Sequence, residues 1–122
     1  MTIATWIVSG LLAAAYLLAG VMKLTRPASA LAESMPYTKD LPLWTTRMIG
    51  ALEILGAIGL IVPWLTGIAP ILTPIAAVAL AVLQLAAFIF HVARKEVERG
   101  LATNVLLFAA AVFVAIARFA GF

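Results

Sequence analysis

Four runs of apolar residues, each close to 20 residues long, follow one another along this chain of 122 residues. A helix needs about 20 apolar residues to cross the hydrocarbon core of a bilayer. None of the runs alternates strictly between apolar and polar residues, as the strands of a membrane barrel do. Because only helices and closed barrels satisfy their backbone hydrogen bonds in lipid, the runs predict four spanning helices. The predicted spans are about 3–22, 43–65, 69–92 and 101–120.

The composition supports a membrane environment. Hydrophobic residues make up 66% of the chain and charged residues 11%, against roughly half and a quarter in soluble domains. A single small domain cannot bury that much apolar surface, so we predict an all-α, four-transmembrane-helix bundle that forms one domain over residues 1–122. With no Cys, one His and five scattered acids, the sequence predicts no metal site and excludes thiol chemistry. The net charge of +3 indicates membrane lipids rather than nucleic acid as the partner.

The basic residues predict the orientation of the bundle. Seven of the eight flank or lie in the two connections that share one side of the membrane: Lys23, Arg26, Lys39, Arg47, Arg94, Lys95 and Arg99. The eighth, Arg118, lies near the end of the last span, toward the opposite side. The positive-inside rule therefore predicts a multi-pass protein of the bacterial inner membrane with both termini in the periplasm. Between Pro27 and Pro36 we expect a short interfacial helix, because proline favours the first position of a helix and interrupts it later.

Three polar residues interrupt the apolar runs at similar depth. With a rise of about 1.5 Å per residue, Tyr16, Glu53 and Gln84 lie about 10, 13 and 12 Å from the predicted cytoplasmic boundary. They come from three different spans. Polar groups in a membrane face the bundle interior or a wet cavity, so we expect these side chains to form one inward-facing layer.

A second polar layer is predicted nearer the cytoplasm. Lys23 follows Tyr16 by seven residues and His91 follows Gln84 by seven, which places each pair on nearly the same helix face. Arg47 and Asn104 lie at the same level on the other two spans. The candidate catalytic residues are Glu53, His91 and Tyr16, and the candidate ligand-binding residues are Lys23, Arg47, Glu53, Gln84, His91 and Asn104. The outer half of the bundle is expected to be purely apolar, with Trp6 and Trp64 as interface anchors.

Structural roles for the same residues stay open at this point. Glu53 also fits a hydrogen-bond anchor, Gln84 an interhelical contact and His91 an interfacial position. Lys23 and Arg47 also fit plain determinants of topology. Gly50, Gly56 and Gly59 surround Glu53 and are expected to let neighbouring helices approach closely.

Three stretches of this sequence resemble the DoxX-like family of small bacterial membrane proteins: "LLAGVMKL", "RMIGALEILGAIGLIVP" and "HVARKE". The resemblance implies a four-helix transmembrane bundle in which Lys23, Arg47, Glu53 and His91 are the family-type polar residues. It also implies a link to redox, quinone or thiosulfate-oxidising complexes, while distant relatives act as membrane chaperones. Some redox relatives use cysteines, which this chain lacks.

Several functions remain as alternatives. The first is an accessory or ligand-binding subunit of a quinone- or redox-linked membrane system, holding a quinone or another lipophilic ligand and contacting a redox-complex partner or a second copy of itself. The second is a membrane enzyme that performs acid–base chemistry on a lipophilic small molecule, of the isomerase, cyclase or epoxide-opening type. The third is a membrane-protein assembly factor. The strong charge bias disfavours a fourth, a proton-coupled exporter of the kind that inserts in both orientations.

Overall fold

The computed structural model describes residues 2–27, 29–30, 42–93 and 101–122. Within these residues the chain forms four long α-helices: α1 (Thr2–Thr25), α3 (Leu43–Thr66), α4 (Leu72–Ala93) and α5 (Leu101–Phe119). Each helix coincides with one predicted apolar run to within three residues at either end. The all-α architecture predicted from the sequence is confirmed.

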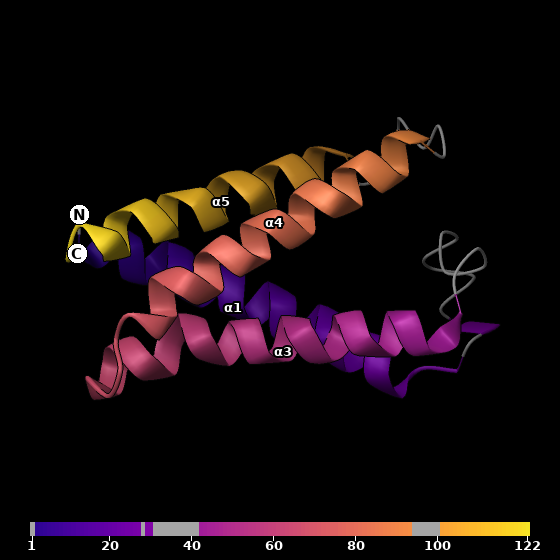
Figure 1. The fold of residues 1–122 in the computed structure, drawn as a ribbon, viewed down its shortest axis with the longest axis horizontal. Helices are drawn as coiled ribbons and strands as arrows, with labels where there is room; N and C mark the ends of the chain where they lie inside the picture. Colours follow the sequence, from indigo (N-terminus) through magenta and orange to yellow (C-terminus); the bar gives the residue numbers. More distant parts are fainter. Residues whose placement is uncertain (1, 28, 31–41, 94–100) are drawn as a thin grey trace.

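The four helices pack as an up-and-down bundle (Figure 1). Contacts join α1 to α3, α3 to α4, α4 to α5 and α5 back to α1, so consecutive helices are neighbours and the ring closes. The start of α1 and the end of α5 therefore lie at the same end of the bundle, as the N and C labels in Figure 1 show. Which side of the membrane this end faces stays a prediction.

The predicted interfacial helix between Pro27 and Pro36 falls largely outside the described residues. Residues 31–41, which include Pro36, are not described, and neither are residues 94–100 of the second basic connection. Four of the basic residues used for the orientation lie in these segments: Lys39, Arg94, Lys95 and Arg99.

The surface and interior of the bundle have the polarity of a membrane protein. Large aliphatic side chains point outward along every helix, including Leu11, Leu55, Val82 and Leu106. Several polar and charged residues are buried inside the bundle: Thr5, Ser9, Lys23, Thr46, Glu53, Thr73, Gln84 and Arg118. Among the described helices, three are long and apolar enough to cross a membrane, and the apolar part of α5, Thr103–Phe119, is shorter.

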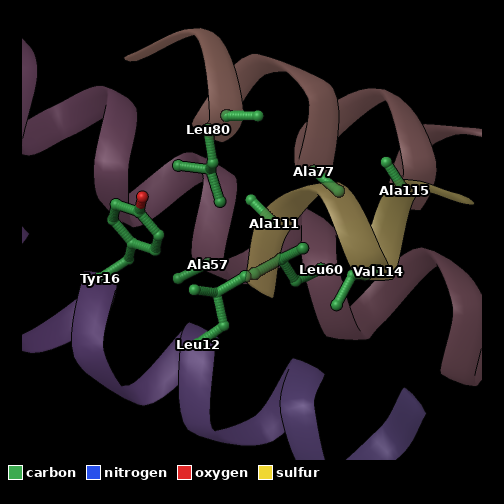
Figure 2. Close-up of a cluster of buried hydrophobic side chains, with 10 residues drawn as sticks. Leu12, Tyr16, Ala57, Leu60, Ala77, Leu80, Ala111, Val114 and Ala115 are labelled. Carbon is green, nitrogen blue, oxygen red and sulfur yellow. The ribbon is translucent and has the colours of Figure 1, made fainter. Parts of the chain in front are cut away.

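A cluster of mostly small apolar side chains fills the middle of the bundle. Every helix contributes to it, with Leu12 and Tyr16 from α1, Leu60 from α3, Leu80 from α4 and Val114 from α5 (Figure 2). Alanines occupy much of the remaining interior: Ala57, Ala77, Ala81, Ala111 and Ala115. Small side chains let helices approach closely, which is how helix pairs gain packing energy when lipid supplies no hydrophobic drive.

The close approach of α1 and α3 depends on two glycines. A Cβ atom on Gly20 would lie 2.6 Å from the carbonyl oxygen of Gly50, and a Cβ on Gly50 would lie 2.8 Å from the carbonyl oxygen of Gly20. The sequence predicted the close approach at Gly50 but not its partner Gly20. On the other flank of α3, Gly56 packs against Leu80 and Gly59 against Ala76 of α4.

A proline inside α3 leaves a backbone carbonyl that α4 satisfies. Pro63 has no N–H to donate to the carbonyl of Gly59 one turn earlier. The hydroxyl of Thr73, a fully buried residue, donates a hydrogen bond of 2.8 Å to that carbonyl oxygen. The Thr73 side chain thus supplies the hydrogen bond that the Gly59 carbonyl lacks within α3, and it links α4 to α3.

We expect Thr73→Val to destabilise the bundle by about 1–3 kcal/mol, because the Gly59 carbonyl is then left without a donor in an apolar interior. Reversible unfolding in mixed detergent micelles, followed by circular dichroism, measures this change. Thr66→Val is the matched control: the Thr66 hydroxyl also bonds a backbone carbonyl, that of Val62, but in an exposed position. Equal losses in the two variants would contradict the proposed role of Thr73.

Candidate polar site inside the helix bundle

An ion pair between Lys23 of α1 and Glu53 of α3 lies inside the bundle. The Lys23 ammonium donates a hydrogen bond to Oε1 of Glu53, and the two side chains are 11% and 3% exposed. Side chains on a helix lean toward its N-terminus. Because α1 and α3 are antiparallel neighbours, Lys23 leans inward and Glu53 leans toward the rim, so that they meet beside the Gly20–Gly50 contact.

Arg47 has a different partner. Its Nη1 donates a 2.7 Å hydrogen bond to the backbone carbonyl oxygen of Lys23, near the end of α1. The residue four positions later is Pro27, which has no N–H for that carbonyl. A cation at the C-terminal end of a helix is also favoured by the helix dipole. Arg47 therefore caps α1 and orients Lys23 through its backbone, while the carboxylate of Glu53 is left to the Lys23 ammonium.

Tyr16 and Gln84 are buried beside this ion pair. They are 1% and 9% exposed, and Tyr16 lies at one edge of the central cluster (Figure 2). The Gln84 side chain lies within hydrogen-bonding range of the Tyr16 hydroxyl, and the Glu53 carboxylate is also close. In the described part of the chain, however, neither this hydroxyl nor Oε1 of Gln84 makes a hydrogen bond of good geometry. Three helices thus place a carboxylate, a phenol and a carboxamide together, and the inward facing predicted for this layer is confirmed.

The upper layer predicted from the sequence is only partly assembled by the described contacts. Asn104 is half-buried, and its Nδ2 has no hydrogen-bond partner among the described residues. His91 belongs to α4, but its side chain lies outside the description. Thr46, seven residues before Glu53 on the same face of α3, is 1% exposed with a hydroxyl that lacks a partner in the described ranges. The spacing of seven residues between Thr46 and Glu53 already indicated that they share a helix face. Thr46 is therefore a further candidate for this site.

These unpaired groups determine what the site can do chemically. Leaving a buried hydroxyl or amide oxygen without a hydrogen bond costs about 1–3 kcal/mol each. A molecule that offers both a hydrogen-bond acceptor and a donor would recover that free energy. No set of three or more His, Asp or Glu side chains is gathered into a metal site in the described ranges.

An apolar groove lies elsewhere, between α4 and α5. Its volume is about 320 Å³, and its walls are formed by apolar side chains that include Val82, Phe108 and Ile116. None of the predicted site residues lines it. The groove is therefore separate from the Lys23–Glu53 pair.

The opposite end of the bundle corrects one prediction. The outer half was expected to be purely apolar, with Arg118 as a flanking charge, but Arg118 is only 2% exposed. Its guanidinium lies between the rings of Trp6 and Trp64, with Cζ 4.5 Å from each ring centroid. Thr5 and Ser9 are also buried in this half. The two tryptophans, expected as interface anchors, hold a buried cation.

The apolar exterior, the buried polar residues and the helix lengths together define an integral membrane protein built as a helical bundle. The family model described as the DoxX-like family matches residues 7–114, so the chain belongs to the DoxX-like family. This confirms the resemblance seen in the sequence. No curated protein and no solved structure matches the chain.

Proposed function

We propose that this DoxX-like membrane protein binds a lipophilic, carbonyl-bearing molecule such as a quinone among α1, α3 and α4, as a subunit of a redox-linked membrane system. One observation carries the proposal: next to a buried ion pair, the Tyr16 hydroxyl and the Gln84 carboxamide oxygen are buried without a hydrogen bond of good geometry in the described chain. Ligand sites are mostly apolar with a few convergent polar groups, and the interiors of helix bundles commonly host them.

The available groups suit both oxidation states of a quinone. The Tyr16 hydroxyl donates to a quinone carbonyl oxygen, and the Lys23 ammonium has further protons to donate beside its bond to Glu53. Gln84 Oε1 accepts a hydrogen bond from a quinol hydroxyl. Glu53 holds Lys23 in position and balances its charge, so that the site stays neutral when empty.

The orientation belongs to this proposal as well. The concentration of basic residues on one side supports insertion in the bacterial inner membrane with both termini in the periplasm. In that orientation the Lys23–Glu53 pair lies nearer the cytoplasmic face, because Lys23 is in the last turn of α1. A redox partner or a second copy of the chain would bind to the apolar exterior.

The test is a ligand-dependent melting experiment. Protein purified in maltoside detergent is titrated with decyl-ubiquinone, and the melting temperature is followed by circular dichroism. A ligand at about 100 times its Kd stabilises a protein by about 2.7 kcal/mol. We expect this stabilisation in the wild type and a stabilisation smaller by about 0.5–1.5 kcal/mol in Tyr16→Phe and in Gln84→Leu, because each variant removes one hydrogen bond to the ligand.

Thr66→Val is the control, since it removes an exposed hydroxyl at the far end of α3. It should retain the full stabilisation by the quinone. Stabilisation that is undiminished in both site variants, or that is absent from the wild type across the soluble range of the quinone, would contradict the proposed site. Solvent extraction of the purified protein followed by mass spectrometry identifies any lipophilic molecule that it carries from the cell.

A further inference from the structure

Arg118 has one edge of its guanidinium group unused. The side chain lies between Trp6 and Trp64, and its Nη1 donates a 2.5 Å hydrogen bond to the backbone carbonyl oxygen of Phe122. The other two nitrogens, Nε and Nη2, are buried and have no hydrogen-bond partner in the part of the chain that the structure describes. Because Cζ lies over both rings, the tryptophans contribute cation–π contacts and leave these two N–H groups without an acceptor among the described residues.

The free edge has the geometry of an oxyanion receptor. The N–H bonds of Nε and Nη2 point the same way and form a planar fork, which carboxylates and phosphates bind with two parallel hydrogen bonds. The two tryptophan rings hold the guanidinium in place through cation–π attraction. The hydroxyl of Ser9, one turn along α1 from Trp6, is also buried without a partner among the described residues.

No acidic side chain in the described ranges pairs with Arg118, whose Nη1 bonds an oxygen of Phe122, the last residue of this sequence. Glu53 is the only acidic residue in the described ranges, and it pairs with Lys23. Glu53 also precedes Trp64 by eleven residues, which separates it from the Arg118 end by about 16 Å along α3. Nε and Nη2 are buried without acceptors in the described chain, and leaving charged N–H groups in that state destabilises a protein. An oxyanion that accepts a hydrogen bond from both would remove that cost.

We propose that the end of the bundle where α1 begins and α5 ends binds an oxyanion, a carboxylate or a phosphate, on the Nε–Nη2 edge of Arg118. Nε and Nη2 have almost no accessible surface. An incoming oxyanion must therefore move groups packed around Arg118, which include the rings of Trp6 and Trp64 and the Phe122 oxygen that Nη1 binds. Binding is thereby coupled to the environment of the two tryptophans.

That coupling makes tryptophan fluorescence the direct readout. The chain has three Trp residues, and the third, Trp44, is 65% exposed at the other end of α3. In a Trp44→Phe protein, all emission comes from the two rings that hold Arg118. This protein, purified in uncharged maltoside detergent, is titrated with sodium phosphate, with sodium acetate, with sodium chloride at matched ionic strength, and with bicelles containing phosphatidylglycerol.

We expect a saturable change in emission with an oxyanion and none with chloride. A change with phosphate or acetate identifies a free oxyanion as sufficient, whereas a change with phosphatidylglycerol alone identifies a lipid headgroup. Arg118→Lys should weaken the response about tenfold or more, because an ammonium keeps the charge but has no planar fork. Arg26→Lys, a matched change of an exposed arginine at the other end of α1, should leave it unchanged.

The absence of any saturable response in the Trp44→Phe protein would overturn the proposal, and this result does not depend on the folding of an Arg118 variant. An equal response in Arg118→Lys would overturn it as well. Either outcome would assign Arg118 a structural role, satisfied by the two rings and the Phe122 carbonyl. The test involves neither Tyr16 nor Gln84, so its outcome is independent of the quinone site.

Discussion

Lys23→Met is expected to destabilise the bundle by about 3–5 kcal/mol, the usual cost of removing one partner from a buried ion pair. Glu53→Met should have a similar effect, because it leaves the Lys23 ammonium buried without its carboxylate. The double variant should lose far less than the sum, since an apolar pair of similar volume carries no charge to desolvate. A double-mutant cycle on unfolding in mixed detergent micelles measures the coupling between the two residues.

Arg26→Met is the control for this cycle. Arg26 follows α1 directly and is exposed, so its loss should change the free energy of unfolding by no more than about 0.5 kcal/mol. If both single variants remain as stable as this control, Lys23 and Glu53 do not act as a buried pair. A double variant as unstable as the sum of the singles would indicate that each residue contributes independently.

Gly50→Ala is expected to destabilise the protein by about 1–3 kcal/mol through overpacking between α1 and α3. The added Cβ would lie 2.8 Å from the carbonyl oxygen of Gly20 and 2.8 Å from Cβ of Lys23. Neither contact is with the flexible end of a side chain, so the two helices must separate. Gly20→Ala should act in the same direction, because its Cβ would approach the Gly50 carbonyl to 2.6 Å. The same micelle unfolding assay measures both.

Gly10→Ala separates this steric effect from helix propensity. A Cβ at Gly10 meets no atom within 4 Å, and alanine is favoured over glycine inside a helix by about 1 kcal/mol. Gly10→Ala should therefore be neutral or slightly stabilising. A Gly50→Ala protein as stable as Gly10→Ala would show that the close approach of α1 and α3 contributes little to the fold.

The positions of the helices and the burial of Glu53 could be predicted from the sequence. A run of about 20 apolar residues must span a bilayer as a helix, whatever surrounds it. A lone acid within such a run must turn inward, because lipid offers it no partner. The same reasoning placed Tyr16 and Gln84 beside Glu53, since depth along a helix follows from counting residues.

The Arg118 cluster was missed because charge counting treats a basic residue near the end of a span as a topology signal. A cue was present: the predicted topology already placed Trp6, Trp64 and Arg118 at the same end of the bundle. The contacts of Arg118 with Trp6 and Trp64, however, join positions 112 and 54 residues apart, and they require α5 to turn position 118 inward. The sequence pattern around Arg118 does not indicate how α5 is rotated about its axis.

By itself, the sequence determined the positions of the helices, their membrane environment and the depth of each polar residue. These properties depend on local composition and on a constant rise per residue. Only the tertiary structure decided the partners: Lys23 rather than Arg47 for Glu53, Thr73 for the carbonyl freed by Pro63, and two tryptophans for Arg118. The physical reason is that partners depend on how closely neighbouring helices approach and how each is rotated about its axis. In this bundle, contacts such as Gly20 against Gly50 set that distance and rotation.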